Sequence, residues 1–249
     1  MEETRHTSAL VLKRQDYRES DSLVTVYTRD FGKLSLVARG TKKLHSKLAG
    51  HLEPANLIDL LIIKGKNLDY VGSAVNSDAY LGVKDNLNKI YYVGKALAWF
   101  NRLVRSGESD QRLFFLLGRW LEVLDVYPVS NLNKERGELL WNFFALKLMT
   151  ELGYQPEMYQ CLDCHQKIAP GQNYFNLKNG GLVDISCHER GRVSGAYIAS
   201  ELLMISDNCV KIIRFIIKSD FDSVSKIRID KKLIKELSSV VSGFLAFHV

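Results

Sequence analysis

The sequence lacks the short motifs that mark the common classes of enzyme. It contains no G-x-x-x-x-G-K-[ST] loop, whose backbone amides hold nucleotide phosphates, and no G-x-G-x-x-G turn for a dinucleotide. Neither the H-E-x-x-H pair of zinc-binding histidines nor the G-x-S-x-G turn that presents a nucleophilic serine occurs in it. We therefore predict no catalytic residues and no nucleotide cofactor, and we expect that the protein is not an enzyme.

Long apolar runs are also missing. The most apolar stretches, such as residues 55–63, are too short to span a bilayer. Residues 1–10, MEETRHTSAL, are acidic and polar and do not contain the apolar core of a signal peptide. We therefore expect a cytoplasmic protein without a membrane partner.

Cysteine is scarce, with four in 249 residues. Two of them form Cys161-x-x-Cys164, and this spacing lets both thiolates reach one tetrahedral ion. In a reducing cytosol, a pair this close favours metal binding over disulfides. Half of a zinc ribbon requires a second half, and Cys187 follows the Gly-Gly turn at 180–181, where that half is expected.

Positive charge exceeds negative charge by a small margin. There are 34 Lys and Arg against 28 Asp and Glu, a formal net charge of +6, which mildly favours an acidic partner. The local excess between Gly32 and Lys66 is stronger, with seven basic residues against Glu53 and Asp59. We predict that this segment binds phosphodiester backbones, the alternative for each residue being a solvated loop. Its basic residues are Lys33, Arg39, Lys42, Lys43, Lys47, Lys64 and Lys66.

Five short apolar or alternating segments in the first 78 residues predict β-strands. Gly32 lies where a hairpin turn requires a positive φ. Five strands with glycine-bearing turns in this length fit an oligonucleotide-binding (OB) barrel, although any small β-barrel or sandwich would give a similar pattern. The aromatic residues in and around the strands are candidates either for base stacking or for the barrel core. The predicted strands are 9–13, 22–28, 33–39, 57–63 and 68–75, and the aromatic candidates are Tyr17, Tyr27, Phe31 and Tyr70.

The apolar period changes from two to 3.6 after residue 77, which predicts an α-helical region. A helix is expected to run to about residue 105, and a second, with an unbroken apolar stripe from Leu113 to Leu124, ends before Pro128. Further helices are expected at 133–152, with Gly153 as the C′ residue, and at 198–218 and 231–248. We therefore predict an α+β chain: an OB barrel at 1–78, a helical domain at 79–155 and 196–249, and a loop-rich insertion at 156–195.

Four stretches of the sequence resemble the RecO family of recombination mediators. They are LVLKRQDYRESDSLVTVYT at 10–28, FGKLSLVARG at 31–40, the dipeptide Ser46-Lys47, and LGYQPEMYQCLDC at 152–164, where that family enters its zinc-finger insertion. The resemblance implies an OB-fold barrel followed by a helical bundle that a small zinc-ribbon-like insertion interrupts.

The same resemblance implies a function and partners. The family binds single- and double-stranded DNA, anneals complementary strands, and engages the C-terminal tail of the single-stranded-DNA-binding protein (SSB). With RecR it helps to load RecA, so RecA would be an indirect partner. We therefore expect a DNA repair and recombination protein in the cytoplasm, associated with the nucleoid.

One position departs from the pattern of the family. Where its zinc-bearing members have a cysteine, this sequence has Asp184. Three alternatives follow. Zinc binds an oxygen of Asp184, or one of the nearby histidines, His165 or His188, supplies the fourth ligand. In the third alternative, packing holds the insertion together without a metal. We predict a structural zinc site made by Cys161, Cys164, Asp184 and Cys187.

The expected docking site for the SSB tail is an apolar groove rimmed by cations on the helical domain. Arg112 and Arg119 flank the Leu113–Leu124 stripe, and a guanidinium grips a terminal carboxylate bidentately. The alternative is that both arginines only solvate the outer face of their helix.

Two other functions fit parts of the sequence. A fragment of a DNA-joining enzyme would also combine a barrel with a zinc module, but the sequence contains no K-x-D-G adenylation motif. A scaffold whose barrel binds only protein is the third possibility. Binding of polynucleotides at two salt concentrations distinguishes a DNA-binding mediator from a protein-binding scaffold. A nucleotide-dependent turnover assay tests for a DNA-joining enzyme.

Overall fold

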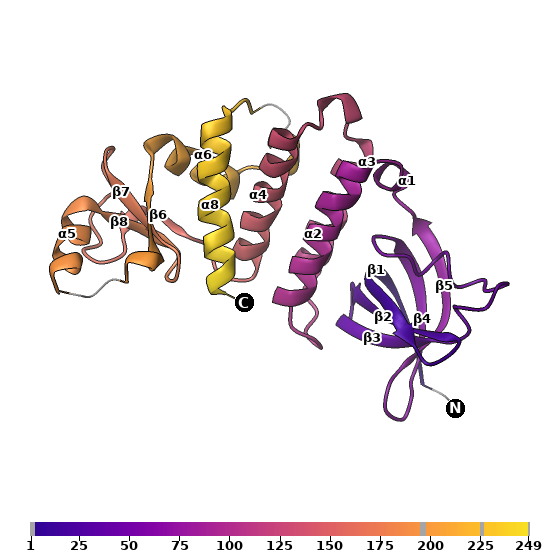
Figure 1. Cartoon of the computed structure of the whole chain (residues 1–249). Coiled ribbons are helices and arrows are strands. Elements are labelled where there is room, and N and C mark those ends of the chain that lie inside the picture. Colours follow the sequence, from indigo (N-terminus) through magenta and orange to yellow (C-terminus); the bar gives the residue numbers. More distant parts are fainter. Residues whose placement is uncertain (1–2, 195–197, 225–226, 249) are drawn as a thin grey trace. The chain divides into compact units, whose positions relative to one another are not determined.

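The computed structural model describes residues 3–194, 198–224 and 227–248, and the chain divides into two compact units, Met1–Val129 and Ser130–Val249. The first unit contains a β-barrel and three helices, and the second contains a small sheet and five helices (Figure 1). Among the helices of the described residues, none is both long and apolar enough to cross a membrane.

The first unit begins with a closed five-stranded barrel, as predicted, in the strand order β1-β2-β3-β5-β4. The first strand is longer than the predicted 9–13, because its polar ends pair with different neighbours. Residues 4–10 pair with β4, and residues 13–17 continue alongside β2. The sequence did not predict these polar ends, because strands are recognised by apolar alternation and the ends have none. The strands are β1 (Thr4–Tyr17), β2 (Asp21–Thr28), β3 (Gly32–Ala38), β4 (Leu57–Ile63) and β5 (Tyr70–Asp78).

Alternating residues of the strands fill the barrel. Val24 and Val26 of β2 and Ile58 and Leu60 of β4 are among its fully buried side chains. Gly32, in the hairpin between β2 and β3, has a φ of +67°, which confirms the predicted turn. A Cβ at Gly32 would also lie 2.2 Å from the carbonyl oxygen of Glu108, so the close backbone approach requires glycine as well.

Helices α1 (Leu81–Lys84), α2 (Leu87–Leu103) and α3 (Gln111–Val126) complete the first unit. Side chains of Asn86 and Asp110 cap the N-termini of α2 and α3 by accepting backbone N–H bonds. Tyr27 of β2 joins the barrel to the helices, because its ring meets Phe100 edge-on at 5.0 Å and its hydroxyl bonds the backbone of Asp110 at 3.1 Å.

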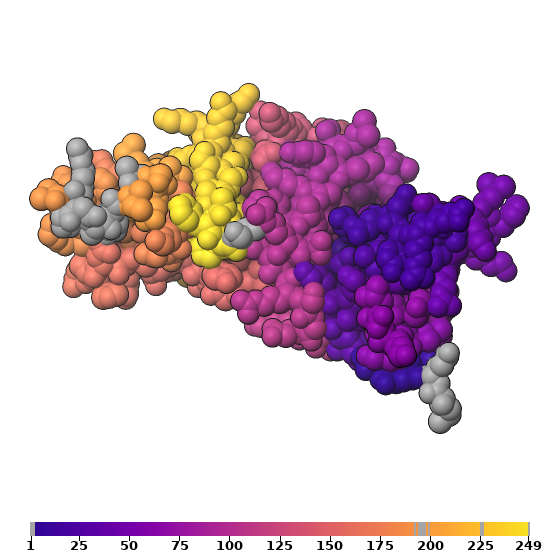
Figure 2. Space-filling model, turned by 60° about the horizontal axis from the view of Figure 1, so that its bottom comes forward, coloured from indigo at the N-terminus to yellow at the C-terminus, as the bar shows by residue number. Residues whose placement is uncertain are grey.

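The second unit combines a four-stranded sheet of order β6-β8-β7-β9 with helices. Helix α4 is buried on nearly all sides, and Gly153, with a φ of +88°, ends it as predicted. Helix α8 lies at the surface of this unit, where Figure 2 shows its side chains in yellow. A short 3-10 helix, η1 (Val129–Asn131), lies at the boundary between the two units. The elements that follow it are α4 (Lys134–Glu151), β6 (Glu157–Cys161), β7 (Asn173–Asn176), β8 (Gly181–Asp184), α5 (Ile185–Ser194), η2 (Ala199–Glu201), β9 (Leu202–Ile205), α6 (Asp207–Lys218), α7 (Phe221–Val224) and α8 (Lys231–Phe247).

The helix predicted over 198–218 is wrong in its first part. Leu202–Ile205 is a strand that pairs antiparallel with β7, and the helix begins at Asp207 after the cap of Ser206. A short apolar run suits a strand and a buried helix equally, and here pairing with a distant strand decides between them. The predicted boundary between residues 195 and 196 lies outside the described residues.

Candidate functional site

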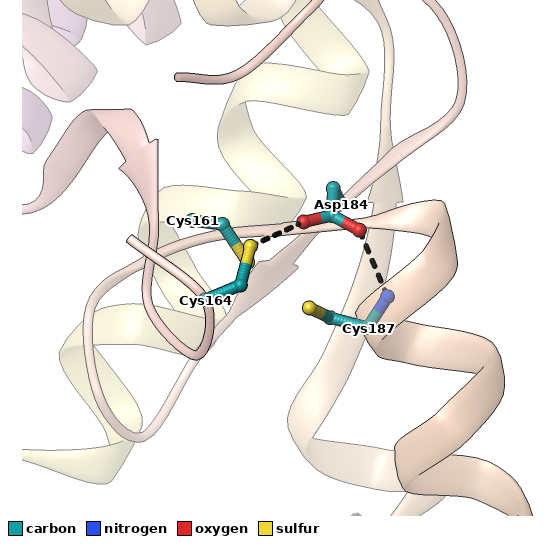
Figure 3. A group of neighbouring side chains, drawn as sticks. All are labelled: Cys161, Cys164, Asp184 and Cys187. Atoms are coloured by element: carbon teal, nitrogen blue, oxygen red, sulfur yellow. Dashed lines mark hydrogen bonds between the residues drawn. The ribbon is translucent and has the colours of Figure 1, made fainter. Parts of the chain in front are cut away.

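Four potential metal ligands converge in the second unit (Figure 3). Cys161 ends β6, Cys164 lies in the turn that follows, Asp184 ends β8, and Cys187 lies in the first turn of α5. Strands β6 and β8 are parallel neighbours, so their carboxyl ends lie together. The three sulfur atoms and one carboxylate oxygen all lie within 4.8 Å of one another.

Hydrogen bonds hold three of the four residues, Cys164, Asp184 and Cys187, in place. Asp184 accepts the backbone N–H of Cys187 at 2.8 Å through Oδ1 and the thiol of Cys164 at 3.1 Å through Oδ2. Arg190, one turn beyond Cys187 on α5, donates to the Cys187 sulfur at 2.8 Å. Arg190 was not among the predicted site residues, although its i+3 spacing from Cys187 on a helix was a signal for it.

The surroundings set the protonation states of the ligand groups. Burial raises the pKa of the Cys187 thiol to about 12, and the neighbouring thiols and carboxylate raise it too. Burial acts to raise the pKa of Asp184, but the hydrogen bonds from the Cys187 N–H and the cysteine thiols outweigh it and hold that pKa well below its ordinary value. Without metal, the Cys164 and Cys187 thiols, whose pKa values are both raised, are therefore protonated beside the ionised carboxylate of Asp184.

This donor set fits a metal ion. Three thiols and one carboxylate match the soft and hard ligands that zinc accepts in a tetrahedral site, and the residues could hold such an ion. Neither predicted alternative ligand belongs to the cluster. The His188 ring instead stacks on Tyr174 with the ring centroids 3.6 Å apart, and His165 occupies the turn after Cys164 with a φ of +58°.

The predicted basic residues fall into two groups. Some already have contacts within the barrel unit: the Lys33 ammonium donates to the carbonyl of Asn101 at 2.7 Å and to that of Val104, and burial lowers the pKa of Lys33. Lys42 pairs with Asp16 at 3.2 Å, Lys64 lies 3.9 Å from Asp69, and the Arg39 guanidinium lies over the Tyr70 ring at 4.1 Å. Lys43, Lys47 and Lys66 are exposed, and none of these three is ion-paired with a described residue.

The loop that carries most of these residues is anchored by Arg14, which the sequence did not reveal. Its guanidinium donates to the carbonyl of Ala49 at 2.9 Å, to that of Thr41 at 3.3 Å and to the carboxylate of Glu53 at 2.7 Å. The loop between β3 and β4 is therefore tied at both ends to β1. Of the aromatic candidates, Tyr27 is fully buried and belongs to the core.

The predicted partner-binding arginines lie on the outer face of α3. Arg112 pairs with Asp110 at 2.8 Å, and Arg119 pairs with Glu122 at 3.0 Å. Phe115, between them on the same face, exposes 55% of its surface, and the Arg29 guanidinium lies 5.7 Å from the centre of its ring. This face therefore combines an exposed aromatic ring with three cations.

Comparison with known proteins gives consistent matches along the chain. The family described as recombination protein O, N terminal, matches residues 1–80, and the one described as recombination protein O, C terminal, matches residues 84–249. The chain is 26% identical over 245 residues to the DNA repair protein RecO of Alkaliphilus metalliredigens, which covers 98% of this chain and 93% of that protein. It is 27% identical over 244 residues to the DNA repair protein RecO of Dehalococcoides mccartyi, covering 97% and 89%. Against the DNA repair protein RecO of Heliobacterium modesticaldum the identity is 29% over 237 residues, covering 94% and 81%.

Proposed function

The chain belongs to the recombination protein O family, and from this membership we propose that it is a non-enzymatic DNA repair protein that binds single- and double-stranded DNA and anneals complementary strands. The observation that carries the proposal is the closed five-stranded barrel whose anchored β3–β4 loop presents Lys43 and Lys47 without counter-charges among the described residues. Cations of this kind bind phosphates of any sequence, because they release the counterions of the nucleic acid.

Annealing requires that two polyanions be held close together without their bases being read. Lysine side chains on a loop provide this, because their contacts are to phosphates and leave the base edges free to pair. Anchoring of the loop by Arg14 supports the same role, since a preorganised loop loses less conformational entropy when it binds.

Titration of the purified chain with a single-stranded polynucleotide at about 50 mM and 200 mM salt tests DNA binding. We expect affinity to fall steeply between the two concentrations. A scaffold that binds only proteins would bind the polynucleotide at neither concentration. A DNA-joining enzyme would turn over ATP or NAD in the presence of nicked DNA, and we expect no turnover.

The partners follow from the same membership. We propose that the chain acts with RecR to help load RecA onto DNA covered by SSB, and that the SSB tail docks on the outer face of α3. The exposed ring of Phe115 and the nearby cations of Arg112 and Arg119 support this docking site, because a terminal carboxylate and an apolar end would find both contacts there. A tail peptide titrated against the wild type and an Arg112→Glu/Arg119→Glu variant tests it, and equal affinities would exclude this face.

We further propose that Cys161, Cys164, Asp184 and Cys187 hold one structural zinc ion. The ion would cross-link the ends of β6 and β8 to α5, which is a role in folding rather than in chemistry. The convergence of the four ligand atoms within 4.8 Å supports it. Elemental analysis of protein purified without added metal is expected to give about one zinc per chain, and a zero would mean that packing holds this part of the fold.

A further inference from the structure

The outer face of α6 carries a row of cations that the DNA-binding proposal for the barrel does not use. Lys211, Arg214 and Lys218 follow one another at spacings of three and four residues, which places them on one stripe of the helix. The opposite stripe is the buried one, with Ile212, Ile213 and Ile216 among its residues. Because this apolar stripe fixes the rotation of the helix, Lys211 and Lys218 are exposed and Arg214 is half-buried at the edge of the row.

Strand β6 lies beside this stripe and contributes an aromatic ring. The Arg214 guanidinium lies 4.6 Å from the centre of the Tyr159 ring, and the Lys218 ammonium lies 5.1 Å from it. Arg214 also donates to the carbonyl of Met158 at 2.9 Å through Nε and at 2.5 Å through Nη2. A carbonyl carries no net charge, so Arg214 joins the strand to the helix and keeps its positive charge.

The acidic groups of the same two elements bond backbone N–H groups rather than the cations of the row. Glu157 of β6 accepts the backbone N–H groups of Tyr159 at 2.7 Å and Gln160 at 3.1 Å. Asp207, in the first turn of α6, accepts the N–H of Gly171 at 3.0 Å. Among the described residues, none of the three cations has a carboxylate as an ion-pair partner.

We propose that this surface, formed by Lys211, Arg214 and Lys218 of α6 and Tyr159 of β6, is a second binding site for a nucleic acid backbone and holds the second strand during annealing. The three cations span about 10.5 Å at 1.5 Å per residue, which corresponds to about three phosphate-to-phosphate steps of a stacked strand at 3.4 Å each. Tyr159 and Phe215 expose 42% and 40% of their surfaces, and exposed rings beside a cationic track are the platform on which bases stack. A row of charges with aromatic rings matches a nucleic acid strand better than an acidic peptide, whose charges do not repeat so regularly.

This inference rests on the proposed function, because a second strand has a role only if the chain anneals DNA. The test compares the full chain with Lys211→Glu/Lys218→Glu and with a matched control, Lys232→Glu/Lys235→Glu, which makes the same charge change on the exposed face of α8. The probe is a non-complementary oligonucleotide of about 16 nucleotides, near the upper limit of what one OB barrel covers. Binding stoichiometry and affinity are measured with it, and annealing is then measured with complementary strands.

We expect the wild type and the control to bind two strands per chain and to anneal at equal rates. The α6 variant should bind one strand with unchanged affinity and anneal about tenfold more slowly. A factor of about ten is what the loss of a single bidentate or stacked contact with a base produces. Lys211→Gln/Lys218→Gln repeats the test without charge reversal, and melting temperatures check that each variant is folded.

Three results would overturn the inference. The α6 variant could anneal like the wild type, it could lose the first strand together with the second, or it could lose binding of a polyglutamate peptide while annealing normally. A wild type that neither binds nor anneals DNA would instead contradict the proposed function, and the two failures are thereby distinguishable.

Discussion

Removal of the exposed lysines of the barrel unit should change the salt dependence of DNA binding by a predictable amount. The relevant residues are Lys43, Lys47 and Lys66, because they are the exposed lysines of the predicted basic segment that have no ion-pair partner among the described residues. Each phosphate contact contributes about 0.7 to the slope of log affinity against log salt for a single strand, so three contacts contribute about 2. When salt is raised from about 50 mM to 200 mM, both proteins lose affinity. A slope smaller by about 2 means that the factor by which the variant loses affinity is about 20 times smaller than the factor for the wild type.

The assay is fluorescence anisotropy with labelled single strands of two unrelated sequences over that salt range. The variant Lys43→Ala/Lys47→Ala/Lys66→Ala should bind both sequences more weakly at low salt and show the flatter slope. The control variant Lys231→Ala/Lys232→Ala/Lys235→Ala removes as many charges from α8 and should keep the slope of the wild type. An unchanged slope in the first variant would refute the assignment of these lysines to the phosphate backbone.

Three further predictions concern single groups. Lys33→Met should leave the salt slope unchanged and lower the free energy of unfolding by about 1–3 kcal/mol in denaturant titration, because the Lys33 ammonium bonds the carbonyls at the end of α2; a flatter slope with full stability would contradict this. Asp184→Cys should raise zinc affinity in chelator competition, because it completes a four-thiolate site, whereas an affinity below that of the wild type would exclude Asp184 from the ligand shell. Zinc affinity should rise from pH 6 to pH 8, since the pKa of Cys187 is raised to about 12 and zinc has to displace thiol protons; an affinity independent of pH would show that thiols are not the ligands.

The barrel was predictable because its signals are local. Alternation along β2 and β4 places every second residue in the core, and the hairpin between β2 and β3 requires a glycine at position 32. The contacts of Lys33 were not predictable, since its carbonyl partners lie 68 and 71 residues away along the chain. The number of Lys and Arg residues in a sequence segment is therefore larger than the number that are available to bind DNA.

The metal cluster shows the same division. The Cys161-x-x-Cys164 pair is a local signal, and so is the position of Cys187 one turn from Asp184. Their convergence depends on the parallel pairing of β6 with β8, which no periodicity encodes. Strand β9 was missed for a related reason, because its pairing with β7 overrides an apolar run that suits a helix as well.

The most direct test of the central claim is the rate at which complementary DNA strands anneal in the presence of the purified chain, without any nucleotide. The account predicts that the wild type accelerates annealing at low salt and that the acceleration decreases steeply as salt rises, because phosphate contacts carry the binding. Annealing at the uncatalysed rate over the whole salt range would contradict the account.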